Sequence, residues 1–354
     1  MTETEIAGRR IGTGCTPYVI AEISANHLGS KAAAIELVHA AGEAGVDAVK
    51  FQHFTPDTIT IACDHPDFRI GGGTLWDGRT LADLYAEAMM PWEWTAELVD
   101  EALRADITWM SSPFDRTAVD FLDELDVPAL KIASFEIVDL PLIRYAASKG
   151  RPLIISTGMA TLSEIDASVR AAQQGGAPSV ALLRCNSGYP ARAGEMDLRA
   201  IPSMADLWDV PIGLSDHTLG ATAAVAAVAL GACIVEKHLT TRRSDGGPDA
   251  EFSVEPEELA ALVAAVREAH AMLGRVRFGP SERELTSIGF RRSLRAVRPI
   301  AAGERITVDN VRSVRPAGGL APDMIDSVIG MTAVRPIDLG APIAWSDLSG
   351  PHAP

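Results

Sequence analysis

The most constraining feature of the sequence is an alternation that runs through its first three quarters. Eight short runs are rich in β-branched and other apolar residues, and helical patterns lie between them. Because each run is apolar on both sides, it predicts a strand buried on both faces, as in a parallel sheet covered by helices. The runs cover residues 18–24, 48–52, 107–112, 129–134, 152–157, 180–185, 210–215 and 232–238.

Eight strands that alternate with helices predict an α/β fold of the (β/α)8 TIM-barrel type. The alternative is a doubly wound parallel sheet. That fold commonly carries a GxGxxG sequence after its first strand, and no such sequence follows the first run here. The barrel is therefore the favoured architecture.

The character of the sequence changes near Arg275, where the last helical pattern of the barrel ends. Further on, AVRPIAAGERITVDNV (296–311) matches AVRPIDLGAPIAWSDL (333–348). This internal repeat predicts a small β-rich domain with approximate twofold symmetry. We expect a barrel domain at residues 1–274, a linker at 275–290 and a second domain at 291–354.

Composition and charge exclude several classes of protein. A formal net charge of −16 argues against a nucleic-acid binder but leaves a small anionic substrate open, since that needs only a local positive pocket. The four cysteines lack zinc-ligand spacing, as expected of reduced thiols. The N-terminus has no signal-peptide core, and the uncharged stretch 219–235 is too short for a membrane span. We expect a cytoplasmic protein with no nucleic-acid or membrane partner.

Polar or ionisable residues mark the end of every predicted strand. In a TIM barrel the chemistry lies at the carboxyl ends of the strands, so this pattern predicts an active site there. An ordinary core would not require polar residues at all eight ends. The residues are Glu22, Lys50, Gln52, Ser111, Ser112, Lys131, Ser134, Ser156, Thr157, Ser187, Ser215, His217, Glu236 and His238.

Strand periodicity indicates which of these side chains share a face. Residues two apart point the same way, so Ser215 and His217 should both face the barrel interior, as should Glu236 and His238. Two inward imidazoles on neighbouring strands fit a divalent-metal site, although hydrogen-bonded core histidines remain the simpler interpretation. Asp216 and Lys237 should face the other way, in packing or in an ion pair with a neighbouring helix.

Lys50 and Lys131 are the second indication of a site. A lysine that lines a barrel needs an anionic partner, and a substrate phosphate or carboxylate would serve. The hydroxyls of Ser134, Ser156 and Thr157 would add neutral donors. The sequence thus predicts an anion pocket on one side of the barrel mouth and a metal on the other.

The connection from Phe54 to Met90 is unusually long for a compact barrel. Connections of this length are commonly either functional or disordered. Because the segment contains Trp76, Tyr85 and three consecutive glycines, we interpret it as an ordered loop that covers the substrate.

Several ordered segments resemble the signature sequences of the sialic acid synthase family, and the resemblance covers nearly the whole chain. The segments are AEISANHLGS, AVKFQ, SSPFD, KIAS, STGMA, GLSDHT, EKHLT and GGPDAEFS. The tail, with FRRSLRAV and VRPAGGL, resembles the family's antifreeze-like SAF domain, a β-clip fold. The segment LWDGRTLADLYAEAMMPWEW resembles the branch of the family that makes pseudaminic acid.

The resemblance implies a transferase that forms a C–C bond between phosphoenolpyruvate and an N-acylated amino sugar. It implies that Mn2+, or else Mg2+ or Co2+, binds His217 and His238. Glu22 would sit beside the reacting carbons, and Arg315 would reach the partner's active site in a domain-swapped homodimer. Phosphoenolpyruvate would be held by Lys50, Lys131, Ser134, Ser156, Ser187 and Ser215. The sugar would be faced by Gln52, Tyr189, Glu236, Asp249 and Arg315.

A mechanism follows from these expectations. A metal on His217 and His238 would polarise the sugar aldehyde, C3 of phosphoenolpyruvate would attack it, and Glu22 could stabilise the oxocarbenium ion at C2. Water would then add at C2 and phosphate would leave. Glu22 could instead be a buried partner of a lysine, and Asp249 could simply cap a loop.

Three alternatives remain open at this point. The same chemistry could act on the sugar precursor of N-acetylneuraminate or legionaminate. A Schiff-base aldolase or lyase would use Lys131 as its nucleophile. A carbohydrate-binding protein without catalytic activity would need none of the polar strand ends.

Overall fold

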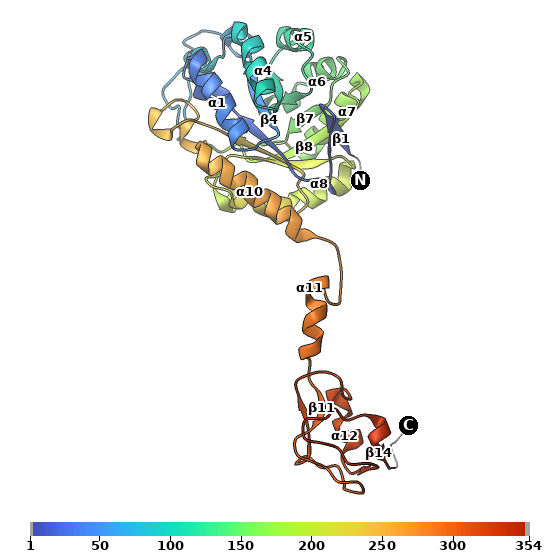
Figure 1. Ribbon diagram of the computed structural model, residues 1–354. Coiled ribbons are helices and arrows are strands. Elements are labelled where there is room, and N and C mark those ends of the chain that lie inside the picture. Colours follow the sequence, from blue (N-terminus) through green and yellow to red (C-terminus); the bar gives the residue numbers. More distant parts are fainter. Residues whose placement is uncertain (1–2, 351–354) are drawn as a thin grey trace. The chain divides into compact units, whose positions relative to one another are not determined.

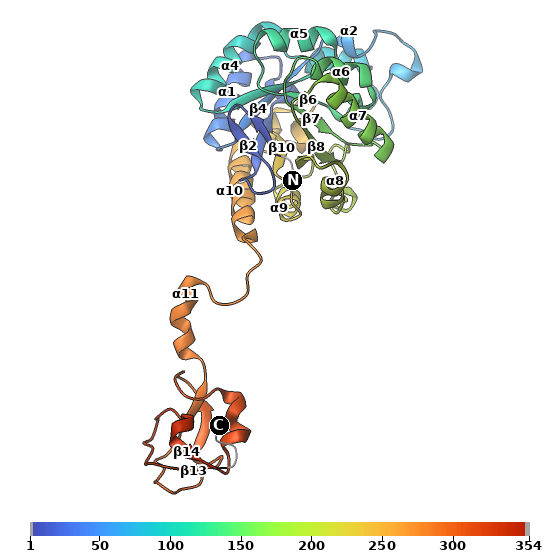
Figure 2. The same cartoon turned by 90° about the vertical axis from the view of Figure 1, so that its right-hand side faces the viewer.

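The computed structural model describes residues 3–350 and divides the chain into two compact units, residues 1–274 and 275–354. The first unit is a closed barrel of eight parallel strands with helices around it, as Figures 1 and 2 show. The predicted TIM barrel is confirmed. Its strands are β3 (Tyr18–Glu22), β4 (Ala48–His53), β5 (Thr108–Pro113), β6 (Leu130–Ile132), β7 (Leu153–Ser156), β8 (Val180–Cys185), β9 (Ile212–Asp216) and β10 (Ile234–His238).

Alternate residues of each strand explain why the predicted runs are apolar on both sides. One set packs outward against the helices, as Val19, Val49 and Leu214 do. The other set points into the barrel, where Ile20 and Ile234 belong to a second buried cluster. Toward the carboxyl ends of the strands, the inward-facing positions are occupied by ionisable residues instead of apolar ones. The carboxyl ends of the strands therefore combine burial with charge.

The helices around the barrel begin at residues that cap them. Ser30 accepts a hydrogen bond from Ala33 N at the start of α1, and Thr161 forms a capping box with Glu164 at the start of α7. The surrounding helices are α1 (Lys31–Glu43), α4 (Thr95–Arg104), α5 (Arg116–Glu124), α6 (Leu140–Ala147), α7 (Leu162–Gly175), α8 (Ala200–Trp208), α9 (Thr222–Ala229) and α10 (Pro256–Leu273).

A hairpin at the start of the chain was not predicted. Its strands β1 (Thr4–Ile6) and β2 (Arg9–Ile11) pair antiparallel, and Ile6 and Ile11 are fully buried. Both isoleucines join the inner barrel cluster that contains Tyr18. The hairpin therefore supplies apolar side chains to the end of the barrel opposite the carboxyl ends of the strands. Strands of three residues are too short for their periodicity to be seen in the sequence.

The second unit shows the symmetry that its sequence repeat predicts. Ile300 and Ile337 stand at equivalent places in the two repeats and exchange backbone hydrogen bonds of 2.8 and 2.9 Å. The bond from Gly303 N to the Ala333 carbonyl likewise has its counterpart from Gly340 N to Ala296. The short strands are β11 (Ser293–Ala296), β12 (Val311–Val314), β13 (Thr332–Ala333) and β14 (Leu348–Ser349).

The segment that we expected to be a plain linker contains helical turns. The helix α11 (Glu282–Leu285) is followed by a 3-10 turn at Thr286–Phe290. Ser281 caps α11, because its side chain accepts a hydrogen bond from Glu284 N. Within residues 3–350, no helix has the length and apolar character needed to cross a membrane.

Candidate active site

A cavity of about 350 Å³ opens at the carboxyl ends of the barrel strands. Its volume lies within the usual range for sites that hold small molecules. The polar part of its lining comes mainly from the strand ends, and the apolar part comes mainly from the connection between β4 and α4. The polar lining includes Ser24, Lys50, Gln52, Lys131, Ser134, Glu136, Ser156, Tyr189, Ser215, His217, Glu236, His238 and Asp249.

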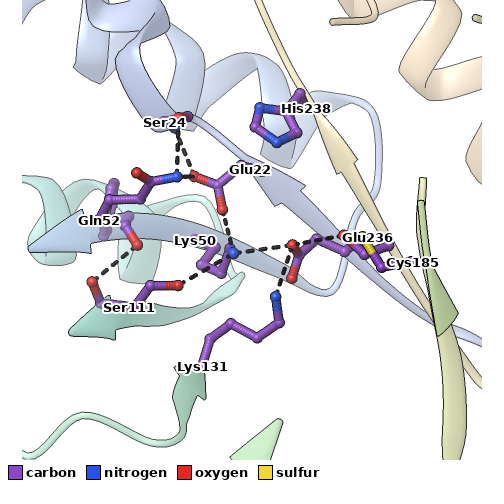
Figure 3. A network of polar contacts seen from close by, with 12 residues as sticks. Glu22, Ser24, Lys50, Gln52, Ser111, Lys131, Cys185, Glu236 and His238 are labelled. Atoms are coloured by element: carbon purple, nitrogen blue, oxygen red, sulfur yellow. Dashed lines mark hydrogen bonds and ion pairs between the residues drawn. The ribbon is translucent and has the colours of Figure 1, made fainter. Parts of the chain in front are cut away.

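Two lysines and two glutamates form a buried network at the floor of this cavity (Figure 3). Lys50 Nζ lies 2.6 Å from Glu22 Oε2 and 3.0 Å from Glu236 Oε1. Lys131 Nζ lies 3.2 Å from the same oxygen of Glu236. We expected a substrate phosphate or carboxylate to be the anionic partner of these lysines. In the structure both lysines already have carboxylate partners. A buried charge is tolerable only with such pairing.

The network shifts the ionisation of its members. Burial raises the pKa of Glu236, but the ammonium groups of Lys131 and Lys50 outweigh it and leave that pKa far below its usual range. Burial lowers the pKa of Lys50 to about 7, although Glu236 acts in the other direction. Lys50 is therefore poised to exchange a proton near neutral pH.

Glu22 is placed differently from the sequence expectation. It is fully buried, and it is absent from the residues that line the cavity. Its Oε1 accepts hydrogen bonds from Ser24 N at 2.8 Å and Gln52 Nε2 at 3.3 Å, while Oε2 faces Lys50. The contacts of Glu22 thus agree with the alternative interpretation, in which it is a buried partner of a lysine, here Lys50.

Serine hydroxyls gather beside the lysines around Gly158. Ser134 Oγ accepts a hydrogen bond from Gly158 N at 3.2 Å. A Cβ atom at Gly158 would lie 2.8 Å from Ser134 Oγ and closer still to Ser187 Oγ, so only glycine leaves room for both hydroxyls. Ser156 Oγ is buried without a hydrogen-bond partner in the described structure. These donors beside two ammonium groups suit a phosphate or carboxylate.

The two candidate metal ligands face each other across β9 and β10. The ring centroids of His217 and His238 are 5.3 Å apart. His217 Nδ1 lies 2.8 Å from the Asn186 carbonyl and donates to it, which leaves Nε2 free to bind a ligand. His238 Nδ1 is buried without a hydrogen-bond partner, and Asp249 Oδ2 lies 3.8 Å from it.

These residues fit a divalent ion with two protein ligands. An unpartnered imidazole nitrogen in a buried polar site is what a metal would satisfy. Burial, together with the neighbouring His217, lowers the pKa of His238 well below its usual value, so its ring is in the neutral, metal-binding form. Burial also lowers the pKa of His217, but Cys185 outweighs it and the net shift is upward. Among residues 3–350 no cluster of three or more metal-ligating side chains is found, so water or substrate would complete the coordination.

The connection between β4 and α4 covers the cavity, as we predicted. It contains α2 (Pro56–Ile59) and α3 (Leu81–Ala88). Trp76 Nε1 donates to the Pro248 carbonyl at 2.9 Å, and the Trp76 ring lies 5.5 Å from that of Tyr189. The apolar wall contributed by this connection consists of Phe54, Ile59, Ile70, Trp76, Leu81, Leu84, Tyr85 and Ala88.

The structure does not bring every predicted residue of the first unit to the cavity. Ser111 faces away from the barrel interior, where its Oγ lies 2.6 Å from His53 Nδ1. Thr157 donates to the Leu183 carbonyl. Arg315 is exposed and belongs to the second unit. Asp249 does not cap a loop, since its carboxylate accepts a hydrogen bond from Ser24 Oγ.

Sequence reasoning missed several residues of the cavity, among them Ser24, Phe114 and Glu136. Ser24 links Gln52 to Asp249, and Phe114 packs against Phe54 at a centroid distance of 5.3 Å. Glu136 lines the cavity with one carboxylate oxygen buried and unpartnered, and burial raises its pKa to about 7. Glu136 lies in the 3-10 turn after β6, and its position two residues beyond Ser134 was the available signal.

Comparison with known proteins matches residues 37–277 to the NeuB family and residues 291–349 to the SAF domain. The chain is 40% identical to a pseudaminic acid synthase of Campylobacter jejuni, over 93% of this chain and 96% of that one. It is 35% identical to an N,N'-diacetyllegionaminic acid synthase of Legionella pneumophila, over 95% and 96%.

A solved structure agrees with these sequence matches. The N-acetylneuraminic acid synthetase of Leptospira borgpetersenii, in complex with citrate, superposes with a TM-score of 0.72 and 31% identity. The match covers 81% of this chain and 95% of that one. The likeness thus extends beyond the barrel architecture that unrelated enzymes share.

Proposed function

This chain belongs to the NeuB family, and on that basis we propose that it is a pseudaminic acid synthase. The reaction joins phosphoenolpyruvate to 2,4-diacetamido-2,4,6-trideoxy-β-L-altropyranose with water, and it releases pseudaminic acid and phosphate. The observation that carries the proposal is the cavity with its two kinds of lining. The strand ends and the loops after them supply lysines and serines suited to an anion, and the connection between β4 and α4 supplies an apolar wall suited to a deoxygenated, N-acetylated sugar.

The anion side supports a phosphoenolpyruvate site made by Lys50, Lys131, Ser134, Ser156, Ser187 and Ser215. Lys131 and Ser215 both contact Glu236 Oε1, at 3.2 and 3.4 Å. An incoming phosphate or carboxylate would compete with Glu236 for these donors. Substrate binding would therefore exchange one set of ion pairs for another, which limits the cost of taking the substrate's charge out of water.

Divalent-metal binding is part of the proposal, with Mn2+ first and Mg2+ or Co2+ as alternatives. His217 and His238 would hold the ion, and it would supply Lewis-acid polarisation of the sugar's aldehyde oxygen. The support is the unpartnered Nδ1 of His238 and the orientation of His217 by the Asn186 carbonyl.

The chain's own groups account for the charge that develops on the substrate. Attack by C3 of phosphoenolpyruvate on the aldehyde carbon leaves positive charge at C2, and the Glu236 carboxylate lines the cavity where it can stabilise that charge. Water then adds at C2 and loses a proton. Lys50, held between Glu22 and Glu236 with a pKa of about 7, can relay that proton to the oxygen of the former aldehyde. The C2 hydroxyl then gives its remaining proton to the departing phosphate as the C–O bond breaks and the C2 ketone forms.

Sugar binding would use other polar residues of the cavity lining. Gln52, Tyr189 and Asp249 all line the cavity, and Tyr189 stacks near both His217 and Trp76. These groups offer hydrogen bonds to hydroxyl and amide groups, while the wall formed by Leu84 and its neighbours offers contact to methyl groups.

A homodimer completes the proposal, with Arg315 of each subunit acting at its partner's cavity. The support is exposed apolar surface in both units. Phe135, Met159 and Leu219, which follow three barrel strands, are 61%, 62% and 60% exposed. In the second unit, Phe278 is 95% exposed. Apolar side chains this exposed commonly mark contact surfaces, and we assign them to a second copy of this chain.

Two further points of the proposal concern the sugar and the compartment. The 35% identity to a legionaminic acid synthase keeps a legionaminate or N-acetylneuraminate precursor as the second candidate substrate. We place the enzyme in the cytoplasm, which agrees with four cysteines that form no disulfide.

The decisive experiment measures phosphate release with phosphoenolpyruvate, Mn2+ and a panel of amino sugars. We expect the diacetamido altrose to have the highest kcat/KM, and EDTA to abolish turnover until Mn2+ is restored. A wide preference for N-acetylmannosamine would refute the pseudaminate assignment. Borohydride trapping of a covalent adduct on Lys131 would instead establish the aldolase alternative.

A further inference from the structure

Lys237 is a fully buried lysine that the proposed mechanism does not use. It lies on β10 between Glu236 and His238, with its side chain on the opposite face of the strand. The sequence predicted packing or an ion pair with a neighbouring helix. The observed partners are instead at the end of the neighbouring strand β9 and in the loop after it, because Nζ lies 2.8 Å from Asp216 Oδ2 and also donates to the Thr218 carbonyl.

These partners stand immediately before and after His217. Asp216 also accepts hydrogen bonds on Oδ1 from Thr218 N at 2.9 Å and Thr218 Oγ1 at 2.8 Å. One ammonium group and one carboxylate therefore fix the backbone on both sides of the histidine. The His217 carbonyl is held separately by Ala191 N at 3.0 Å.

Lys237 is also the covalent neighbour of His238. A single side chain thus ties the end of β9, which carries one imidazole, to the end of β10, which carries the other. We infer that Lys237 is a positioning residue that holds His217 and His238 at the separation needed to bind a divalent ion. The inference rests on the metal site of the proposed function.

Two physical arguments support a positioning role over simple packing. Buried ion pairs contribute little net stability compared with apolar side chains of similar volume, so an apolar pair could fill the space between β9 and β10. A site with only two protein ligands has few other means of fixing its geometry. Outer groups that orient metal ligands commonly change metal affinity by about 10- to 100-fold.

The test compares Mn2+ affinity in the wild type and in the double variant Asp216→Asn, Lys237→Met. The double variant removes the charge pair without leaving a lone buried charge, and asparagine can still accept from Thr218 N. Free Mn2+ is quantified by its electron paramagnetic resonance signal, so no turnover is required. We expect Mn2+ binding to weaken about 10- to 100-fold, while phosphoenolpyruvate binding without metal changes less than about twofold.

A matched control removes a buried carboxylate elsewhere in the barrel. The side chain of Asp47 is 5% exposed, pairs with Arg9 and lies 3.4 Å from Arg267, and in the described structure it contacts neither histidine. Asp47→Asn should reduce thermal stability and leave Mn2+ affinity unchanged. Equal losses of Mn2+ affinity in the control and the double variant would show a general effect of destabilisation and overturn the inference.

The remaining outcomes separate this inference from the proposed function. Absence of Mn2+ binding by the wild type would refute the metal site itself. Wild-type binding together with an unchanged affinity in the folded double variant would overturn only the role of Lys237. If the double variant does not fold, Thr218→Val provides the test, because it removes one hydrogen bond to Asp216. We then expect a several-fold weaker affinity, and an unchanged affinity overturns the inference.

Discussion

Glu236 contacts Lys50 and Lys131 through one carboxylate oxygen, although the two lysines are on strands that are not neighbours. One inward carboxylate thus neutralises charge from two sides of the barrel. Its neighbour Lys237 points to the outer face of the strand and forms an ion pair there with Asp216. Adjacent residues of β10 therefore belong to two separate buried networks, one that meets the substrate and one that fixes the strand ends.

Gly158 gives a first test at this scale. Gly158→Ala places a methyl group against the hydroxyls of Ser134 and Ser187 and should raise the KM for phosphoenolpyruvate about tenfold or more, an effect worth about 1.4 kcal/mol. Steady-state kinetics with saturating sugar measures this change. Gly194→Ala is the control, since a Cβ atom there meets nothing within 4 Å. An unchanged KM in Gly158→Ala would place the phosphate elsewhere.

Glu136 gives a second test, in the stability of the free enzyme. Its folded pKa of about 7 lies above the usual value of 4.5, so the folded state binds the proton more tightly. This carboxyl group therefore destabilises the fold increasingly as pH rises from about 4.5 to 7, by at most about 3 kcal/mol, and has no effect below that window.

Glu136→Gln should accordingly be more stable than the wild type at pH 8 and equal to it at pH 4. Urea denaturation at both pH values measures the difference. The exposed Glu251, changed to glutamine, serves as the control. A gain at pH 8 no larger than that of the control would mean that Glu136 titrates normally.

Among the elements, the connection from β4 to α4 has the clearest separate role. It supplies the apolar wall, whereas the strand ends supply the charges. Its contacts with other segments at the cavity include the bond from Trp76 to the Pro248 carbonyl and the ring contact with Tyr189. We assign the apolar contacts with the sugar to this connection, so a change in it should leave anion binding by the lysines at the strand ends intact.

Trp76→Ala should separate these two functions. The loss of one hydrogen bond and one ring contact should raise the KM for the sugar about 10- to 100-fold, or about 1.4 to 2.8 kcal/mol, with less than a threefold change for phosphoenolpyruvate. Leu75→Ala is the control, because Leu75 neighbours Trp76 but is absent from the cavity lining. Equal changes in both KM values would contradict the division of roles.

At the scale of the whole molecule, the two units have separate cores. The barrel contains the charge network, and the second unit is a small repeat around its own apolar cluster, which includes Leu294 and Ile343. A catalytic contribution from Arg315 therefore requires that the second unit of one copy act on a barrel, and we propose that this barrel belongs to the other copy.

Complementation between two inactive variants tests this arrangement. Arg315→Ala keeps its barrel intact, and Lys131→Met keeps its second unit intact. If Arg315 acts in the partner's site, one site of each mixed dimer is complete, and random mixing should restore about a quarter of wild-type activity. Unfolding and refolding the mixture would allow exchange. No recovery from variants shown to form mixed dimers would place Arg315 in its own subunit's site or in none.

Much of the fold of this protein, and part of its candidate site, could be predicted from the sequence alone, because strand periodicity is local. The alternation of apolar runs predicted the barrel, and the spacing of Glu236 and His238 predicted that both face its interior. The repeat near the C-terminus predicted a symmetric second domain. Each of these inferences depends on neighbours in the chain or on a recurring pattern. None of them needs knowledge of which strands meet across the barrel.

Only the tertiary structure decided which groups pair. Closure of the barrel brings Glu236 against Lys50 and Lys131, turns Glu22 into a buried partner, and places Lys237 between the residues that flank His217. The buried oxygen of Glu136 and the need for glycine at position 158 also depend on distant segments. Coulombic and steric effects act through space over a few ångströms, so the partners of a buried charge cannot be obtained from periodicity alone.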